Sequence, residues 1–300
     1  MRRIELYNAI PSIECATRWA KERGLLSSQN DCPVCHQAMD EVPNICSDGK
    51  IWKCSRIING LRHYRKLSIR TGSIFANSNM SIRDILFTMY EWSIKTRRDD
   101  TAYQMNIERK TVGNWFKICS GIASFMVDKR VPYQIGDEDT IVEIDECQVG
   151  RRKSHRGRIP KECWVFGGLV RGSSPQVCFI EIVSKRNERT LTEVIGRRIH
   201  ARARIISDGW SAYKNLRRLG YNHNAVNHSE NFVNPLDSTI HTQGIENLWK
   251  CLRNFLNTKG SYSRKHISCY IKEFIFRKYF IDHFECLLSG IEQKYKPSNL

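Results

Sequence analysis

The sequence predicts an α/β domain with a mixed sheet flanked by helices, preceded by a small cysteine-containing segment and a helical domain. From about residue 136 onward, strand-like and helical runs alternate, which is typical of a sheet covered by helices. Before that point, apolar residues recur at helical spacing, and Cys32 and Cys35 are separated by only two residues. We therefore divide the chain into an N-terminal helix, the cysteine segment, the helical domain, the α/β domain and a tail: residues 1–30, 31–75, 76–135, 136–284 and 285–300.

The α/β part begins with three strand-like runs, 140–149, 163–170 and 176–183, of which the last two have a Gly/Ser/Pro turn between them and predict a hairpin. Shorter strands and helices follow. These are the helices 190–200, 210–219, 240–256 and 263–279 and the strands 204–207 and 225–227. Three strands followed by strand–helix alternation match the order of a ribonuclease-H-like sheet.

The helical domain contains a candidate DNA-binding element between residues 101 and 115, which reads as a short helix, a turn and a second helix. Thr111 is the expected cap of the second helix. Arg109, Lys110 and Asn114 are then expected to face DNA from its N-terminal half. The alternative is an ordinary helical hairpin between domains.

The charge of the chain limits the kinds of partner. Lys and Arg number 48 against 31 Asp and Glu, which gives a net charge of +17. Such an excess repels itself unless an acidic partner offsets it, and nucleic acid is the commonest such partner, with an anionic membrane surface as the alternative. The sequence has no apolar run of the roughly 18 residues that span a bilayer. We expect an intracellular, soluble protein that binds nucleic acid and no membrane.

A zinc site is predicted from the spacing of Cys32 and Cys35, because two thiolates separated by two residues can bind one Zn²⁺ ion from a tight turn. Cys54 is the best third ligand. The fourth ligand stays open between residues within reach in sequence: Cys46 or His63, with His36 as a further option. Most of the other cysteines stand singly in apolar stretches, so a disulfide framework is not expected; the alternative is that the pair are incidental thiols.

Three carboxylates stand where strands and a helix of one sheet can bring them together. Asp145 lies on the first strand, Asp208 ends a buried strand, and Glu246 lies on the long helix that follows. Two Mg²⁺ or Mn²⁺ ions roughly 4 Å apart, held by oxygen ligands, catalyse in-line phosphoryl displacement. The alternatives are a turn or cap role for Asp208 and a surface role for Glu246. For Asp145 the alternative is a solvent-facing strand residue, with one of its neighbours as the true ligand: Glu143 or Glu146.

Two cations follow Glu246 on the same helix. Lys250 and Arg253 lie one and two turns beyond it and line up on the same face. A carboxylate with cations at this spacing suits a metal ligand beside DNA phosphates, although Glu246 and Lys250 can also form a simple surface pair.

At these residues the sequence resembles the zinc-ribbon-bearing DDE transposases of bacterial insertion sequences and their eukaryotic relatives, the Merlin elements. The resemblance covers about residues 30–280, with short blocks in the same order. The blocks are Cys32-Pro33-Val34-Cys35, Trp52-Lys53-Cys54, and residues 68–75, 142–146, 207–210, 226–229 and 241–247. The second half of the ribbon departs from the family pattern, since only Cys54 is clear there.

The resemblance implies a ribonuclease-H fold, Mg²⁺-dependent cleavage of element ends and strand transfer by a 3′-hydroxyl. It makes Asp145, Asp208 and Glu246 the metal ligands, gives Arg253 the basic position beyond the glutamate, and puts His228 near the site or in a buried structural role. It also implies a DNA-contacting loop, or else a solvated charge run, in the basic stretch that contains Arg151, Arg152, Lys153 and Arg158. Family behaviour suggests a homo-oligomer on DNA, in the nucleus if the host is eukaryotic. The competing functions are a domesticated, non-catalytic DNA-binding protein and a nuclease that cuts without joining.

Overall fold

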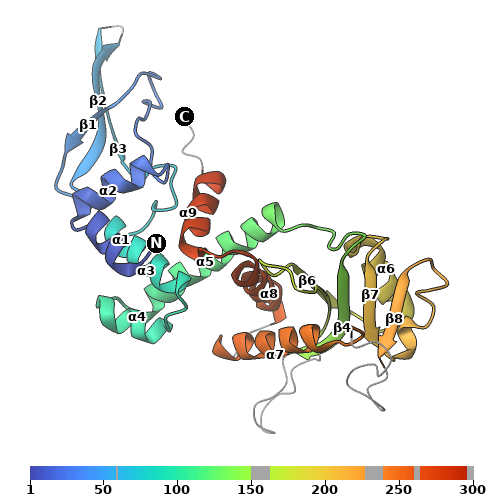
Figure 1. The fold of residues 1–300 in the computed structure, drawn as a ribbon. Coiled ribbons are helices and arrows are strands. Elements are labelled where there is room, and N and C mark those ends of the chain that lie inside the picture. The colour runs from blue at the N-terminus through green and yellow to red at the C-terminus, as the bar shows by residue number, and fades with distance from the viewer. Residues whose placement is uncertain (59, 150–162, 227–238, 260–263, 296–300) are drawn as a thin grey trace. The chain divides into compact units, whose positions relative to one another are not determined.

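The structure is a computed structural model, which describes the chain except for residues 59, 150–162, 227–238, 260–263 and 296–300 (Figure 1). Two compact units can be distinguished. Unit 1 combines residues 1–126 with residues 282–300, and unit 2 comprises residues 127–281. Several residues predicted from the sequence to be functional lie outside the described residues: Arg151, Arg152, Lys153, Arg158 and His228.

Unit 2 is an α/β unit around a five-stranded mixed sheet with the strand order β6-β5-β4-β7-β8. The strands are β4 (Ile141–Val149), β5 (Cys163–Val170), β6 (Cys178–Val183), β7 (Arg204–Asp208) and β8 (Asn222–Val226). Strands β6, β5 and β4 are antiparallel, and β4, β7 and β8 run parallel. The predicted hairpin of β5 and β6 is confirmed.

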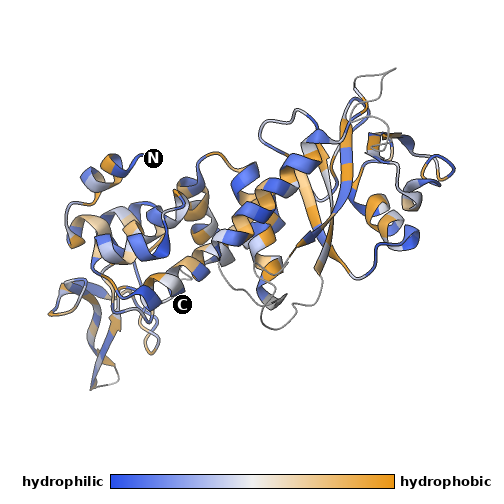
Figure 2. Ribbon diagram, turned by 90° about the horizontal axis from the view of Figure 1, so that it is seen from below, coloured by the Kyte–Doolittle hydropathy of each residue, from blue (hydrophilic) through white to orange (hydrophobic). Residues whose placement is uncertain are grey.

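The two faces of this sheet are covered by different helices. The helices are α6 (Glu188–Arg198), α7 (Gln243–Thr258) and α8 (Arg264–Tyr279). Helix α7 packs on β4 and β5, and α8 packs on β6. On the other face, Val142 and Ile144 of β4 join α6 in a hydrophobic core. Figure 2 shows orange, hydrophobic stretches in the strands of the sheet, interrupted by blue, hydrophilic ones.

The prediction of an α-helix over residues 210–219 is wrong. Only a short 3₁₀ helix, η1 (Ser211–Tyr213), forms there, followed by turns. Its backbone bonds reach back three residues, as from the Tyr213 N–H to the Trp210 carbonyl and from the Leu216 N–H to the Tyr213 carbonyl. Tyr213 and Leu216 are both buried, and their spacing of three residues equals one turn of a 3₁₀ helix.

The first part of unit 1 contains two helices and a three-stranded sheet. These are α1 (Arg3–Ala9), α2 (Ile13–Glu22), β1 (Asp40–Pro43), β2 (Lys50–Ile58) and β3 (Leu61–Ser68). The strands form an antiparallel sheet in the order β1-β2-β3. Lys21 of α2 pairs with Glu41 of β1 at 2.5 Å, and a buried pair of Arg70 and Asp48, also at 2.5 Å, fixes the end of the sheet segment.

The remaining helices of unit 1 are α3 (Ile82–Ser93), α4 (Arg98–Met105), α5 (Arg109–Arg130), whose last residues belong to unit 2, and α9 (His283–Lys294). The expected tail from residue 285 thus contains a helix, and α9 packs on α3, where the rings of Tyr90 and Phe284 meet edge to face at 5.3 Å. Asp282 caps α9 and also binds the terminal ammonium of Met1 at 2.7 Å. Among the helices that the structure describes, none has both the length and the apolar character needed to cross a bilayer.

Candidate metal centres and active site

Asp145 and Asp208 lie side by side on neighbouring parallel strands. In the register of β4 and β7, Glu143 pairs with Ile206. Each aspartate lies two residues further along its strand, so both stand at the same level and on the same face of the sheet. Adjacent strands are about 4.8 Å apart, which brings the two carboxylates within the reach of a shared cation.

Helix α7 runs along this face of β4 in step with the strand. The Ile245 N–H donates to Glu143 Oε2 at 2.9 Å, the Trp249 indole N–H donates to Asp145 Oδ2 at 3.0 Å, and Arg253 Nη1 donates to Cys147 Sγ at 3.1 Å. Four residues of helix rise about 6 Å and two residues of strand about 6.7 Å, so each helical turn meets the next inward-facing residue of β4.

Glu246 follows Ile245 on α7, so its side chain is rotated by about 100° around the helix axis. Its Oε1 accepts a hydrogen bond from Thr242 Oγ1 at 2.8 Å. Glu246 thus lies in the first turn of α7, next to the residue whose N–H binds Glu143 of β4.

The pKa of Asp145 is set mainly by its burial. Burial raises the pKa of Asp145 to about 6; the backbone N–H of Glu146 and the Trp249 indole counteract the rise, and the negative charges of Asp208 and Glu246 add to it. A divalent cation would offset this mutual repulsion. The oxygens of the three carboxylates are not all within 4.8 Å of one another, since the only such group of potential ligands in the described chain is the cysteine–histidine cluster of unit 1.

Glu143, one of the alternative ligands for the strand, is instead tied into a buried network. It is fully buried and accepts hydrogen bonds from Ile245 N–H and from Arg171 Nε, the latter at 2.8 Å. Arg171 also donates to the carbonyls of Thr239 and His241 just before α7, at 2.5 and 2.7 Å. Gly244 leaves room for this carboxylate, because a Cβ there would lie 2.8 Å from Glu143 Oε2. The network fixes the start of α7 on β4.

Glu146, the other alternative ligand, points to the opposite face of β4, where the Tyr213 hydroxyl donates to it. Burial raises the pKa of Glu146 to about 7, and the Tyr213 hydrogen bond partly offsets the rise. Behind Asp208, buried Ser207 bonds His223 at 2.8 Å between Oγ and Nε2, and burial lowers the pKa of His223 to about 4. Both pairs lie on the face of the sheet opposite to α7.

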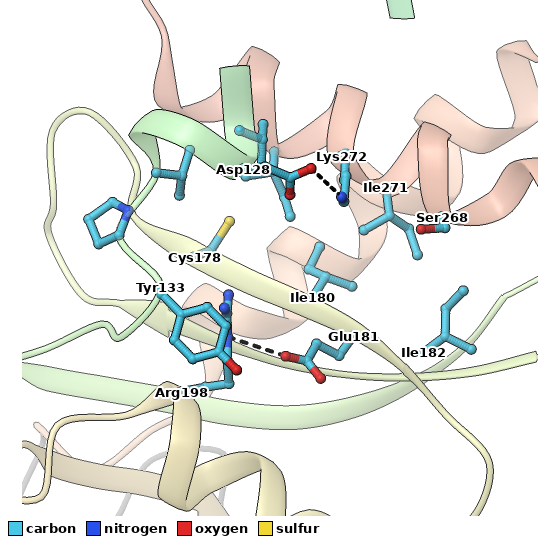
Figure 3. Close-up of a pocket in the computed structure, with 14 residues that line it drawn as sticks. Asp128, Tyr133, Cys178, Ile180, Glu181, Ile182, Arg198, Ser268, Ile271 and Lys272 are labelled. Carbon is cyan, nitrogen blue, oxygen red and sulfur yellow. Dashed lines mark hydrogen bonds and ion pairs between the residues drawn. The ribbon is translucent and has the colours of Figure 1, made fainter. Parts of the chain in front are cut away.

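A cavity of about 350 Å³ lies elsewhere in unit 2, along the edge strand β6 and α8 (Figure 3). Arg198 lies over the ring of Tyr133 at 4.5 Å and within 3.3 Å of Glu181, and Lys272 pairs with Asp128 at 2.6 Å. None of the residues predicted to be functional lines this cavity. Because β5 separates β6 from β4, the cavity is distinct from the carboxylate site.

The predicted zinc ligands come together in unit 1. The ligand atoms of Cys32, Cys35, Cys54 and His63 all lie within 4.8 Å of one another. Cys32 Sγ is 2.9 Å from His63 Nε2, and Cys35 Sγ is 3.6 Å from Cys54 Sγ. Ligands around a tetrahedral zinc ion with metal–sulfur bonds of about 2.3 Å are separated by about 3.8 Å, so the donor set fits this metal.

The structure thus favours His63 over the other options for the fourth position. Cys46 is exposed, and its thiol bonds the carbonyl of Lys50 instead. Arg56 Nη1 lies 4.0 Å from Cys35 Sγ and 3.8 Å from Cys54 Sγ, where it stabilises thiolate charge. The Gln37 backbone N–H lowers the pKa of Cys35. Burial, in contrast, raises the pKa of Cys54 to about 11, so these contacts favour the deprotonated thiol only at Cys35. A bound Zn²⁺ would itself favour the thiolate of Cys54.

Helices α4 and α5 are joined by a short turn in which Asn106 adopts the left-handed conformation. Helix α5 begins at Arg109, so Thr111 lies in its first turn and is not its cap. Lys110 and Asn114 are exposed on one face of α5, as expected, whereas Arg109 pairs with Asp99 of α4. The geometry leaves a polar, basic surface on the first turns of α5.

Sequence reasoning missed the residues that hold the carboxylates in place. Trp249 was not singled out from the sequence, yet its indole N–H bonds Asp145. Arg171 had no recognised role, although it follows β5 directly and faces β4. Glu143 was the one available signal, because it lies on the same face of a buried strand as Asp145 and a buried carboxylate requires a partner such as Arg171.

Comparison with known proteins gives one result. Residues 138–278 match the family model of the ISXO2-like transposase domain, a DDE transposase family. The match includes all five strands of unit 2, α6, α7 and all but the last residue of α8, and it contains all three predicted carboxylates. It supports a transposase of insertion-sequence type. No curated protein matches the chain.

Proposed function

We propose that this protein is a metal-dependent DNA transposase, which cleaves the ends of a mobile element and joins them to target DNA through a 3′-hydroxyl. The transposase match of residues 138–278 supports the class of activity. The observation that carries the proposal is the alignment of Asp145 and Asp208 on neighbouring parallel strands, with Glu246 on the helix packed against them.

The three carboxylates are the proposed ligands of two Mg²⁺ or Mn²⁺ ions. Bound at this site, such ions would activate the attacking oxygen and stabilise the leaving oxygen of a phosphodiester. The protein's own contribution is orientation: Trp249 and the Glu146 N–H each bind one oxygen of Asp145, and the Trp210 N–H binds Asp208 Oδ1 at 3.1 Å. A ribonuclease-H-like fold accounts for this arrangement.

DNA contacts are proposed from charge and exposure. Lys250 and Arg253 are exposed on α7 beyond Glu246, where they suit backbone phosphates next to the cleavage site. In unit 1, the exposed face of α5 with Lys110 and Asn114 suits a helix-turn-helix contact. Residues 150–158 add a further basic segment, and a homo-oligomer on paired DNA ends follows from the proposed reaction.

We further propose that Cys32, Cys35, Cys54 and His63 hold one structural Zn²⁺ ion. A small, polar sheet segment gains most of its folding free energy from such an ion. The resemblance to Merlin elements and a nuclear location remain expectations that depend on the host.

The proposal is tested with the purified chain and a duplex from the DNA that flanks its coding sequence. We expect Asp145→Asn, Asp208→Asn and Glu246→Gln each to abolish Mg²⁺- or Mn²⁺-dependent cleavage while duplex binding stays within about twofold. Glu193→Gln is the matched control, because this glutamate is exposed on α6 in the same unit and pairs with Arg189 on its own helix.

The outcomes separate the competing functions. Strand joining by the wild type, lost in all three variants, supports a transposase. Cleavage without joining on target DNA indicates a nuclease. Binding without any metal-dependent cleavage indicates a non-catalytic DNA-binding protein, and variants that cleave like the control would remove the three carboxylates from the mechanism.

A further inference from the structure

The hairpin of β2 and β3 in unit 1 has a surface that the metal cluster does not use. In its register, Cys54 faces Arg65 and Arg56 faces His63, so these residues share the face that carries two of the metal ligands. The residues between them along each strand point to the opposite face. This second face, the outer face, consists of Lys53, Ser55, Ile57, Arg62, Tyr64 and Lys66.

The outer face is basic and aromatic. Tyr64 is exposed, and the ammonium groups of Lys53 and Lys66 lie 5.6 and 5.5 Å from the centre of its ring. Residues 50–68 contain six Lys or Arg and no Asp or Glu. The hairpin itself therefore has no carboxylate, and the neighbouring strand β1 places Asp40 opposite Lys53.

One cross-strand pair indicates that the outer face serves a ligand. Lys53 and Lys66 stand directly opposite each other. Like charges in this position destabilise a sheet, because their Cβ atoms are only about 5 Å apart. Asp40 offsets part of this repulsion from the β1 side of Lys53. An anionic partner that spans β2 and β3, such as a row of phosphates, would remove the rest.

The tip of the hairpin is aliphatic on both faces. Ile57 and Leu61 are 77% and 76% exposed, and Ile58 pairs with Leu61 on the face opposite to Ile57. A tip that packed on a flat protein surface would need apolar side chains on one face alone. Apolar side chains on both faces suit a wedge between two base planes, each of which presents an apolar surface.

We propose that the β2–β3 hairpin binds duplex DNA through its outer face and inserts its aliphatic tip at a base step, which unstacks and bends the duplex. This inference rests on the proposed function, since it specifies how unit 1 contacts the DNA on which unit 2 acts. The outer face holds the backbone phosphates with Lys53, Arg62 and Lys66, Tyr64 packs on the sugar–phosphate backbone, and Ile57 and Leu61 form the wedge. A two-stranded ribbon is narrow enough to enter a groove of B-DNA.

The experiment measures binding and bending separately in the Asp145→Asn background, so that cleavage cannot affect the readout. The probe is a short duplex from the flanking DNA with a donor and an acceptor dye at its ends and 2-aminopurine at successive positions. Ile57→Ser combined with Leu61→Ser is expected to abolish the increase in energy transfer and in 2-aminopurine fluorescence that the parent shows. Ile45→Ser is the matched control, because Ile45 is a fully exposed aliphatic residue near the same sheet.

The cations are tested in a second variant. Replacing Lys53, Arg62 and Lys66 by Gln is expected to lower the slope of log K against log salt concentration by about 2.7, because each phosphate contact contributes about 0.9. The tip variant should keep the parent's slope. Zinc content equal to that of the parent shows that both variants retain the folded cluster, since every substituted side chain lies outside the four ligands.

Three results would overturn the inference. The first is bending and 2-aminopurine signals in the tip variant equal to those of the Ile45→Ser control. The second is an unchanged salt slope in the triple Gln variant. The third is a change in oligomeric state of the tip variant without DNA, which would assign the tip to a second copy of the chain. If the parent itself bound no DNA, the proposed function would fail, whereas parental binding without these differences would remove only the hairpin's role.

Discussion

Glu143 offers a test of how the fold positions the carboxylate site, because it contacts no predicted metal ligand directly. Glu143→Ala removes a fully buried carboxylate that accepts from the Ile245 N–H at 2.9 Å and from Arg171 Nε at 2.8 Å. The change leaves an uncompensated guanidinium and an unpaired backbone N–H at the start of α7.

The magnitude follows from these contacts. Breaking a buried ion pair by removing one partner costs about 3–5 kcal/mol. Arg171 keeps two backbone carbonyls as acceptors, at 2.5 and 2.7 Å, so we expect a value near the lower end, about 3 kcal/mol. Glu143→Gln keeps the shape and loses the charge, and we expect about 1.5–3 kcal/mol, the range for a hydrogen bond to a charged group.

The assay is hydrogen exchange of the α7 backbone amides together with single-turnover DNA cleavage. We expect faster exchange in the first two turns of α7 and a large loss of cleavage in the Ala variant, with an intermediate effect for Gln. Glu193→Ala, which removes an exposed carboxylate of α6, should change both readouts little. Unchanged α7 exchange in Glu143→Ala, or normal cleavage despite faster exchange, would refute the reasoning.

Three further predictions concern packing, metal and pH. Gly167→Ala places a Cβ 2.6 Å from Trp249 Cη2 and should lower the free energy of unfolding by about 1–3 kcal/mol. Adding Trp249→Phe should restore part of this loss. If the losses of the two single variants simply add up in the double variant, the predicted clash is refuted. Metal analysis should find one zinc per chain, lost in Cys54→Ser and kept in Cys46→Ser, and equal zinc in both variants would contradict the assignment. The pKa of His223 is about 4 in the folded state and about 6.5 in the unfolded state, so its contribution to stability is fully present above pH 6.5 and falls by about 3 kcal/mol in total as the pH decreases toward 4. His223→Gln should therefore make the free energy of unfolding in urea less dependent on pH in this range. An equally steep pH dependence in the variant would show that His223 is not its cause.

Much of the fold of unit 2 could be predicted from local patterns. The strands 141–149 and 163–170 have the lengths and apolar content expected of buried strands, and their boundaries agree with the prediction to within one residue. The segment 210–219 could not be predicted in this way, because Tyr213 and Leu216 satisfy both a helical and a 3₁₀ spacing. Only their packing against the rest of the core decides between the two.

The candidate site was partly accessible from sequence. Strand ends and helix position were enough to select Asp145, Asp208 and Glu246, because the ends of parallel strands meet at one edge. The choice of His63 over Cys46 required the register of β2 and β3, since this pairing brings His63 next to Arg56 and hence close to Cys54. The roles of Trp249 and Arg171 depend on contacts over about 100 and about 30 residues of chain, which no local pattern records.

Asp282 and α9 make the folding of unit 1 depend on the order in which the chain is synthesised. Unit 1 contains both ends of the chain, with α9 on α3 and the first residue bound to Asp282. During translation, therefore, residues 1–126 are synthesised before unit 2, and α9, the last helix of unit 1, is synthesised after it. A chain that ends prematurely lacks the partner of Tyr90 and exposes apolar surface on α3. Unit 1 is therefore completed only after unit 2 has been synthesised, and a product that stops within unit 2 lacks α9.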